Sequence, residues 1–317
     1  MLLQALQLHF PAMTEPRQRI KHIPVVVAQV VQETADTVTL LLDAGDDPRD
    51  YKAGQYVSID PHQFAAIKGY TAFLEDNKGR KEPPRAYSMV STPDERYLAI
   101  TVKEELYDKT GMKYPPLLSP FLVHHPLTGA KMEVTGYAGG YHLPEDVRQR
   151  TDHVVHLCAG SGSVPNVSMI KWALAHEPTL RQTFIYSNKT WNDVIYRDEL
   201  AAMEAKHGDR LRGIHALTRE PETFPYTDRI RRGRVSPDLI RELVGDVTAA
   251  FFFACGPAVT VWEKRAAKAE GREPSPRFME SVHAAMQTLG VPKDHFREEA
   301  VALAVVPDRH PKASSRK

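Results

Sequence analysis

Short apolar runs separated by turn residues dominate the first half of the chain. The runs lie at residues 24–31, 36–42, 55–59, 86–90 and 98–102. Short strands at this spacing, with no long helical pattern between them, predict an antiparallel β-barrel or sandwich. A polar stretch at residues 64–84 interrupts the runs and ends in Lys-Glu-Pro-Pro, and we expect it to be a long loop.

The pattern changes after about residue 146. An apolar run at 153–159 leads into a glycine-rich turn and a helical pattern, and further strand patterns lie at 182–186, 211–217 and 249–254. Strands that alternate with helices predict βαβ units and a parallel sheet. We therefore predict an N-terminal arm at 1–21, a barrel domain at 22–148, an α/β domain at 149–305 and a disordered tail at 306–317.

Composition excludes several classes of function. The 317 residues suffice for two domains, and 41 basic against 40 acidic residues give no general attraction to nucleic acid or to an anionic membrane. Cys158 and Cys255 are too few for an iron–sulfur cluster, a zinc cluster or a disulfide framework, which favours a reducing compartment. The apolar run at 249–255 is far shorter than the roughly 20 residues of a membrane span. No signal peptide is recognisable at the start. Together with the short apolar run and the two cysteines, this leads us to expect a soluble, cytoplasmic protein without a metal site.

Three motifs carry candidate chemistry. Gly160-Ser161-Gly162-Ser163-Val164-Pro165 follows a strand and opens a helix, where glycines and a helix N-terminus suit a pyrophosphate. Arg85-Ala86-Tyr87-Ser88 lies on a strand of the first half, and Cys255-Gly256-Pro257 ends a strand of the second. Each motif alone also fits a structural role: a tight turn without a ligand, an exposed strand rim, or a buried core cysteine.

In this order, the motifs resemble those of the ferredoxin–NADP⁺ reductase superfamily, over about residues 22–302. The resemblance implies an FAD-binding antiparallel barrel followed by a nicotinamide-nucleotide domain. It also implies that Arg85 pairs with the FAD pyrophosphate, that Tyr87 lies flat against the isoalloxazine, and that the Ser88 hydroxyl bonds near flavin N5.

The resemblance assigns further residues on the flavin side. Thr101, Val102 and Lys103 fall on the second flavin-contact strand. Ser119, followed by Pro120, is expected to cap a helix whose N-terminus faces the flavin phosphates. The alternative for Ser119 and Pro120 is an ordinary helix cap without a ligand.

On the nucleotide side, the resemblance assigns the remaining roles. Gly160, Gly162 and Pro165 would take the NAD(P) pyrophosphate, and Cys255 would lie beside the nicotinamide C4. Gly256 and Pro257 would shape the pocket. The run Phe296-Arg297-Glu298-Glu299 resembles the terminal acidic motif of the family, which would place Glu299 near the flavin ring; a surface acidic pair is the alternative.

The nucleotide preference follows from the residues after the second strand of the α/β domain. Ser187, Asn188 and Lys189 stand where a site for the 2′-hydroxyl of NADH would carry an acidic residue. We therefore predict NADPH as the hydride donor, with NADH as the alternative.

The chain departs from the family pattern at three places. Gly136-Tyr137-Ala138-Gly139 replaces Gly-Pro-x-Gly, the methionine expected soon after Cys-Gly-Pro is missing, and Val301 replaces a terminal aromatic residue. An insertion around residues 269–276 is expected to lengthen the helix that follows.

The combined prediction is a flavin-dependent reductase. It would take hydride from NAD(P)H onto FAD and pass single electrons to a separate ferredoxin-like protein or oxygenase component, because the chain lacks the cysteines for its own cluster. Lys78, Arg80, Lys81 and Arg85 are candidate cations for an acidic carrier, or simply solvated residues. Two alternatives stay open: a flavoenzyme that reduces a quinone, a ferric chelate or free flavin, and a redox-inactive FAD-binding subunit of a larger complex.

Overall fold

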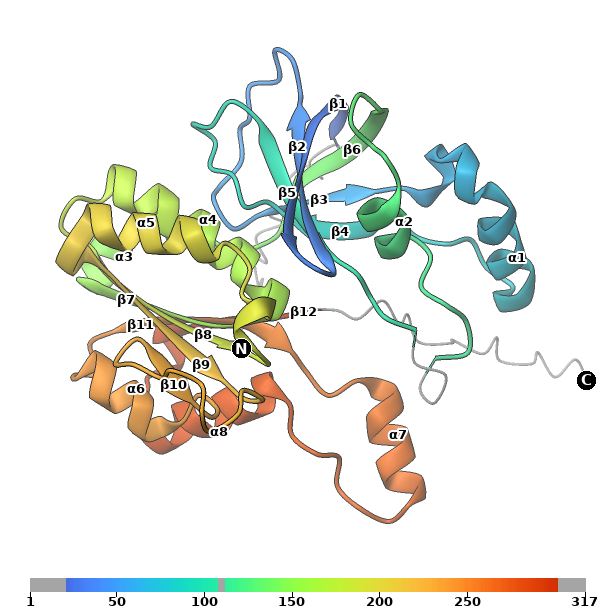
Figure 1. Cartoon of the computed structure of the whole chain (residues 1–317). Helices are drawn as coiled ribbons and strands as arrows, with labels where there is room; N and C mark the ends of the chain where they lie inside the picture. Colours follow the sequence, from blue (N-terminus) through green and yellow to red (C-terminus); the bar gives the residue numbers. More distant parts are fainter. Residues whose placement is uncertain (1–20, 108–111, 302–317) are drawn as a thin grey trace, which may run out of the picture.

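A computed structural model describes residues 21–107 and 112–301, and these residues form two six-stranded sheets. The antiparallel sheet comes first in the chain and the parallel sheet second, with the two halves stacked as Figure 1 shows. This arrangement confirms the predicted fold class. The expected arm, apart from Lys21, and the expected tail lie outside the described residues. The domain boundary expected near residue 149 stays a prediction.

The antiparallel sheet closes into a barrel. Its strands follow the order β4-β3-β6-β1-β2-β5, and Met89 forms a bridge with Ile100 that joins the two ends of this order. Residues Ile23, Val25 and Val27 alternate with exposed neighbours, so one face of β1 fills the core. The strands are β1 (Lys21–Thr34), β2 (Thr37–Asp43), β3 (Tyr56–Ile59), β4 (Arg85–Ser88), β5 (Leu98–Lys103) and β6 (Lys131–Ala138).

The long loop expected at residues 64–84 is wrong in part, because this stretch contains helix α1 (Lys68–Lys78). Gly79 ends the helix in the left-handed conformation, at φ 63°, and donates its N–H to the Glu75 carbonyl. Only Thr71 and Leu74 of the helix are buried, which is why its apolar pattern is weak. Helix α1 stands beside the barrel, on the side away from the parallel sheet's main helices (Figure 1). The shorter α2 (Ser119–His124) packs next to β5.

The parallel sheet has the strand order β10-β9-β8-β7-β11-β12. All seven residues of β7 are buried, as expected for a strand covered on both faces. One face packs on α4 (Ser163–His176) and α5 (Arg197–His207), the other on α6 (Pro237–Val244) and α8 (Phe278–Leu289). The strands are β7 (His153–Ala159), β8 (Arg181–Asn188), β9 (Leu211–Leu217), β10 (Ile230–Arg232), β11 (Phe251–Pro257) and β12 (Phe296–Val301).

The insertion expected around residues 269–276 does not lengthen a helix, contrary to the sequence-based expectation. Helix α7 (Val261–Ala269), which projects from the parallel-sheet half (Figure 1), ends where this insertion begins, and residues 270–276 form a turn and a loop that lead to α8. Gly271, at φ 67°, and the prolines at 274 and 276 separate α7 from α8, because proline and left-handed glycine do not continue a helix.

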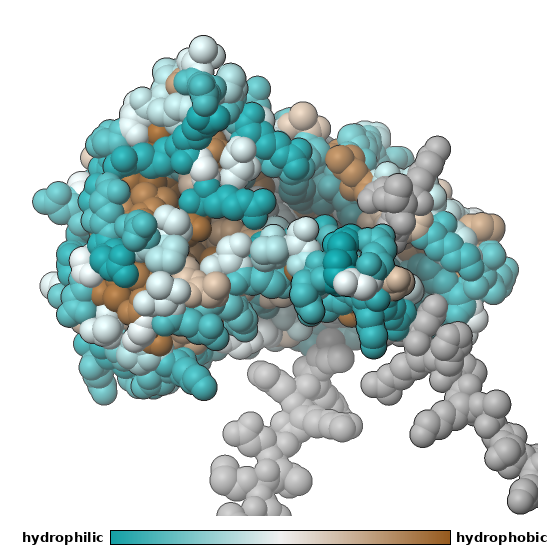
Figure 2. Space-filling model, turned by 90° about the horizontal axis from the view of Figure 1, so that it is seen from below, coloured by the Kyte–Doolittle hydropathy of each residue, from teal (hydrophilic) through white to brown (hydrophobic). Residues whose placement is uncertain are grey.

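Buried hydrogen bonds join the two halves. The Ser168 hydroxyl of α4 donates to the Ser91 carbonyl at 2.7 Å, and the Tyr141 hydroxyl donates to Asn166 Oδ1 at 3.2 Å. Seen from below, the surface is mainly hydrophilic, with apolar residues gathered over the parallel-sheet half (Figure 2). Among the described residues, no helix combines the length and apolar character needed to cross a bilayer.

Candidate functional site

The ends of three neighbouring parallel strands bring three titratable side chains together. Cys255 of β11 lies in register with Cys158 of β7 on one side and with Glu299 of β12 on the other. Residues in register point to the same face of a sheet, so the sequence-predicted pair Cys255 and Glu299 face the same site. Both cysteines are free thiols and are almost completely buried.

The protonation state of this group follows from burial. Burial raises the pKa of Glu299. Burial, and after it the charge of Glu299, raises the pKa of the Cys255 thiol well above its usual range. Cys255 is therefore a neutral thiol at neutral pH and not a thiolate nucleophile.

The nucleotide turn packs directly on the end of β11. A Cβ on Gly162 would lie 2.1 Å from the Cys255 carbonyl oxygen, and one on Gly256 would lie 2.4 Å from the ring of Phe278. These two glycines are therefore required by packing. Gly160 differs, because its φ is 54° and a Cβ there would meet nothing within 4 Å. Of the two predicted pyrophosphate glycines, it is Gly160 that borders open space.

Helix α4 begins directly after this turn. Pro165 is buried in its first turn, as the sequence predicts, and the Tyr186 hydroxyl donates to the Gly160 carbonyl at 2.9 Å, which fixes the turn to β8. Ser187 is half-buried near the end of β8, and Lys189, directly after the strand, is exposed; both lie at the carboxyl edge of the sheet, where α/β proteins bind nucleotides. Pro257, the last residue of β11, is half-buried at the same carboxyl edge of the sheet, two strands away from β8.

The flavin-motif strand β4 carries Arg85, Tyr87 and Ser88. Arg85 Nη2 contacts Glu82 Oε2 at 2.7 Å, and Nη1 donates to the Pro83 carbonyl. A guanidinium has five N–H donors, so Arg85 keeps others for a phosphate. The Ser88 hydroxyl makes no hydrogen bond to any described residue, and burial keeps Tyr87 neutral by raising its pKa. These side chains fit a bound flavin nucleotide.

Glu82 is a buried partner that the sequence did not reveal. Its carboxylate is 2% exposed and contacts both Arg85 and Lys78, the latter at 2.6 Å. Burial alone would raise the pKa of Glu82, but the hydrogen bonds and charges of Lys78 and Arg85 outweigh it and hold the pKa below its usual value.

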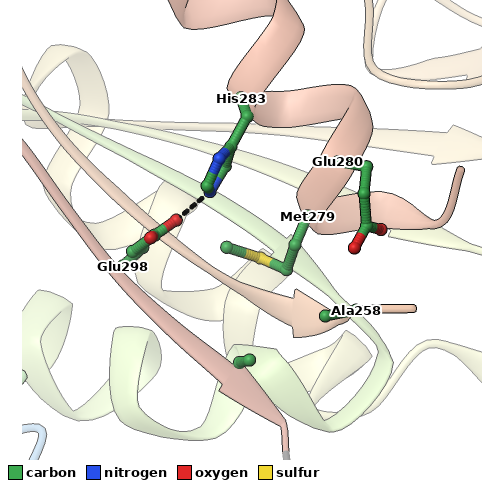
Figure 3. Close-up of a pocket in the computed structure, with 6 residues that line it drawn as sticks. Ala258, Met279, Glu280, His283 and Glu298 are labelled. Carbon is green, nitrogen blue, oxygen red and sulfur yellow. Dashed lines mark hydrogen bonds and ion pairs between the residues drawn. The ribbon is translucent and has the colours of Figure 1, made fainter. Parts of the chain in front are cut away.

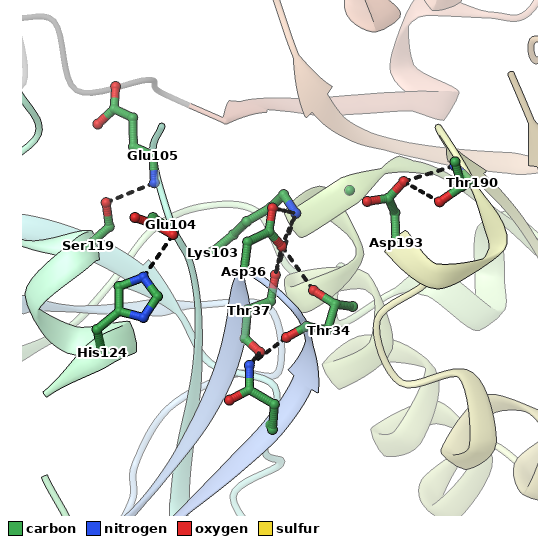
Figure 4. Close-up of polar contacts among 12 residues, drawn as sticks. Thr34, Asp36, Thr37, Lys103, Glu104, Glu105, Ser119, His124, Thr190 and Asp193 are labelled. Carbon is green, nitrogen blue, oxygen red and sulfur yellow. Dashed lines mark hydrogen bonds and ion pairs between the residues drawn. The ribbon is translucent and has the colours of Figure 1, made fainter. Parts of the chain in front are cut away.

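Three predicted flavin contacts have side chains that are engaged elsewhere. The Thr101 hydroxyl contacts Tyr196 and lies 2.8 Å from the Thr39 hydroxyl, and Val102 is fully buried in the barrel core. Lys103 Nζ pairs with Asp36 at 2.5 Å (Figure 4). Only the backbone groups of Thr101, Val102 and Lys103 are therefore available to contact a flavin.

Ser119 does not cap α2, contrary to the sequence-based expectation. The helix begins at Ser119 itself, and the capping position belongs to Leu118. The Ser119 hydroxyl instead accepts the N–H of Glu105 at 3.0 Å, as Figure 4 shows. The competing backbone donor explains the difference, because a hydroxyl that faces β5 is turned away from its own helix.

Glu105 itself was not among the predicted site residues. Its Oε1 atom is buried and has no hydrogen-bond partner among the described residues. Burial raises the pKa of Glu105, while the nearby charge of Arg85 opposes that rise. A buried acceptor without a partner calls for an explanation such as a ligand.

A small pocket of about 250 Å³ lies on the opposite face of β12 (Figure 3). Glu298 pairs there with His283, and neighbouring Glu299 points to the other face because successive strand residues alternate. Met279 of α8 and Ala258 also line this pocket.

Comparison with known proteins supports a binding site for FAD and a nicotinamide nucleotide. Residues 157–261 match the family described as the oxidoreductase NAD-binding domain. The chain is 29% identical over 288 residues to the ferredoxin reductase component of 3-ketosteroid-9-alpha-monooxygenase from Mycobacterium tuberculosis, covering 88% of this chain and 71% of the relative. It is 26% identical over 284 residues to the corresponding component from Rhodococcus rhodochrous, covering 88% of this chain and 65% of that relative.

Solved structures show the same two-domain fold. The FAD/NAD-binding domain of nitric oxide dioxygenase from Vibrio cholerae aligns with a TM-score of 0.64 at 22% identity, covering 88% of this chain and 98% of that one. The ferredoxin reductase of carbazole 1,9a-dioxygenase aligns with a TM-score of 0.62 at 18% identity, covering 90% and 70%. Its barrel, the match to the NAD-binding domain and these relatives make the chain similar to members of the ferredoxin–NADP⁺ reductase superfamily, and they support its assignment as an FAD- and NAD(P)H-dependent oxidoreductase.

Proposed function

We propose that this chain takes a hydride from NADPH onto FAD and passes electrons singly to a separate ferredoxin-like protein or oxygenase component. The reductase components named above are the relatives that support this kind of acceptor. The free, buried state of Cys158 and Cys255 supports a reducing location, the cytoplasm.

One observation carries the proposal: the barrel contacts the nucleotide turn and helix α4 across the domain interface. Strand β5 of the barrel contacts the Gly160–Gly162 turn, and Ser91, three residues after Ser88, accepts a hydrogen bond from α4. These contacts support our proposal that Tyr87 and Ser88 face Cys255 and Glu299 across the interface. Hydride transfer depends on this kind of proximity and orientation.

The roles of the residues follow from their surroundings. When bound, FAD supplies the conversion of a two-electron donor into single electrons. Arg85 would hold its pyrophosphate, Tyr87 would lie against its ring system, and the Ser88 hydroxyl would donate a hydrogen bond near N5. Cys255 would provide a neutral, polarisable wall beside the nicotinamide.

Glu299 would hold a proton beside Cys255 and the nicotinamide. Its raised pKa allows the carboxyl to hold a proton nearer to neutral pH than an exposed glutamate does. The close packing of Gly162 against the Cys255 backbone, and of Gly256 against Phe278, fixes the position of Cys255 at the end of β11.

The proposed preference for NADPH rests on Lys189 and Ser187. A cation and a hydroxyl at the end of β8 would contact the 2′-phosphate, and Gly160 and Pro165 would border the pyrophosphate. A charge-assisted contact of this type is worth about 1.5–3 kcal/mol.

An anaerobic titration tests the proposal. The flavin-loaded protein is mixed with NADPH or with NADH, and bleaching of the flavin absorbance is followed. We expect bleaching at a much lower concentration of NADPH, followed by rapid reoxidation when an oxidised ferredoxin is added. A yellow protein that neither nucleotide bleaches would refute the function. Reoxidation by a quinone but not by a ferredoxin would replace the protein acceptor with a small molecule.

A further inference from the structure

Helix α7 carries three exposed cations that form no ion pair with any residue that the structure describes. They are Lys264, Arg265 and Lys268. The two acidic residues between positions 261 and 272 are engaged with other cations: Glu263 pairs with Arg277 at 2.5 Å, and Glu270 pairs with Arg272 at 2.6 Å. The positive charge of α7 is therefore not offset locally and faces solvent.

The three cations share one face of the helix with an apolar side chain. An α-helix turns by about 100° per residue, so four residues of α7 fall within about 100° of its circumference. We call them the basic face: Val261, Lys264, Arg265 and Lys268. Val261 is 46% exposed, and the Arg265 guanidinium lies 4.9 Å from the ring centroid of Trp262. Arginine and tryptophan are enriched among the residues that dominate binding at protein interfaces.

Polar contacts hold α7 in a fixed orientation. Within the helix, Ala267 alone is buried, so α7 adds little to the hydrophobic core. Thr260 and Glu263 form a capping box at its start, and the Val259 N–H donates to Glu280 Oε1 of α8 at 2.9 Å. A helix that is fixed in place without serving the core favours a role for its exposed face.

Helix α7 lies next to the proposed site of hydride transfer in the chain. Only residues 258–260 separate it from β11, which ends in Cys255, Gly256 and Pro257. The Gly160–Gly162 turn packs against Cys255 at this carboxyl edge of the parallel sheet. From that edge α7 projects into solvent (Figure 1). A protein that accepts electrons from the proposed flavin has to approach the domain interface beside this edge.

The cations of the barrel that the sequence suggests for an acidic carrier are less available. Lys78 and Arg85 both pair with the buried Glu82, at 2.6 Å and 2.7 Å. This carboxylate offsets part of their charge, whereas no described carboxylate offsets the charge of the basic face. The charge that can attract an acidic partner therefore lies on α7.

We propose that the basic face of α7 docks an acidic electron-carrier protein that receives the electrons of the flavin. The inference rests on the proposed function and deepens it, because it names the surface that binds the acceptor and the charge of that acceptor. For each hydride donated by NADPH, two one-electron carriers are reduced and one proton is released to solvent.

The size of the basic face fits a transient complex. A helix of 9 residues is about 14 Å long, and electron-transfer complexes are among the smallest protein interfaces, below about 1,200 Å². Exposed charges at such an interface act mainly on the rate of association and on its salt dependence. Docking on α7 should therefore be weak and sensitive to salt.

The test follows the reduction of a plant-type [2Fe–2S] ferredoxin of strong negative charge by the flavin-loaded full chain with NADPH. One variant combines Lys264→Glu with Lys268→Glu, and a milder one combines Lys264→Gln with Lys268→Gln. At low ionic strength we expect the KM for ferredoxin to rise about 10-fold or more in the Glu variant and less in the Gln variant. The difference from the wild type should shrink at about 0.5 M salt, and the KM for NADPH should not change.

Lys206→Glu combined with Arg212→Glu is the matched control, because it changes the net charge by the same amount. Both residues are exposed, one near the end of α5 and the other near the start of β9, at the amino edge of the parallel sheet. The control should leave the KM for ferredoxin close to that of the wild type.

Several outcomes would overturn the inference. An unchanged KM for ferredoxin in the Glu variant would do so and leave the flavin function standing, as would an equal rise in the control. A raised KM for NADPH alone would assign the basic face to the nucleotide instead. A wild type that reduces a quinone but no ferredoxin would overturn both the docking surface and the protein acceptor. A flavin that NADPH does not bleach would overturn the proposed function itself.

Discussion

Replacing Gly162 with alanine should damage both the stability of the parallel-sheet domain and flavin reduction. The added Cβ would lie 2.1 Å from the Cys255 carbonyl oxygen and 2.5 Å from the carbonyl carbon. Both obstacles are backbone atoms, so no side chain can rotate out of the way. Because non-bonded atoms require about 3.5 Å, the turn and β11 must separate by about 1.4 Å.

The expected magnitudes follow from this displacement. Overpacking of a buried site costs about 1–3 kcal/mol of unfolding free energy. A shift of about 1 Å at a reacting centre slows hydride transfer by up to about 100-fold. We therefore expect a lower free energy of unfolding and slower bleaching by NADPH at saturation, with flavin still bound, since the barrel is untouched.

Tryptophan fluorescence during urea unfolding measures the first effect. Trp172, Trp191 and Trp262, the three tryptophans of the chain, belong to the second half, so the signal reports on that half alone. Stopped-flow absorbance measures the second effect. Gly140→Ala is the control, because a Cβ there meets nothing within 4 Å and its φ is not positive. Wild-type stability and wild-type bleaching in Gly162→Ala would refute the packing argument. Lost stability with unchanged bleaching would refute the link to Cys255.

Four further predictions concern charge and protonation. Lys189→Glu should weaken NADPH about 10- to 100-fold and change NADH little, as the ratio of KM values will show; equal losses would contradict the phosphate role. Cys158 and Cys255, buried and with raised pKa values, should resist iodoacetamide at pH 7 until urea exposes them, which mass spectrometry detects; labelling of the native protein would contradict their neutral state. Burial lowers the pKa of His153, His156 and His215 to about 4, so the folded state binds fewer protons than the unfolded state between pH 6.5 and 4. The free energy of unfolding should therefore fall as the pH drops through that window, by up to about 1.4 kcal/mol per pH unit for each group. A urea midpoint that stays constant over this pH range would contradict the prediction. Tyr141→Phe should cost about 0.5–1.5 kcal/mol of unfolding free energy by removing the hydrogen bond to Asn166, with Tyr137→Phe as a comparison on the barrel; no loss would show that this contact is not stabilising.

The strands and the order of the motifs could be predicted from the sequence because they depend on local patterns. Strand β7 is apolar along its whole length, and β1 alternates strictly over Ile23, Val25 and Val27, so each displays its burial directly. Helix α1 could not be predicted in this way, since Thr71 and Leu74 are its only buried residues. Its one local signal is Gly79, which ends the helix in the left-handed conformation and falls within the expected loop.

The direction of side chains at the domain interface was out of reach for a different reason. Thr101 lies on the expected strand, but its hydroxyl meets Tyr196 from the other domain. A sequence pattern reports that a face is buried, and it does not report which element covers that face. The same applies to Glu105, which is distant from Arg85 in sequence and lies near it only in the folded chain. Glu82 stands only three residues before Arg85, but the sequence does not show that its carboxylate is buried.

The register of the parallel sheet decides what Cys255 can do. A cysteine at the end of a strand can act chemically in two ways: as a nucleophile, or as a wall for a bound ring. A nucleophile requires a lowered pKa and a cation or base nearby. The structure places a carboxyl, Glu299, and a second thiol, Cys158, directly beside Cys255, so every close titratable neighbour opposes ionisation of the thiol. Covalent catalysis by Cys255 is thereby disfavoured, and in the proposed function its fixed position against Gly162 is the property that matters for hydride transfer.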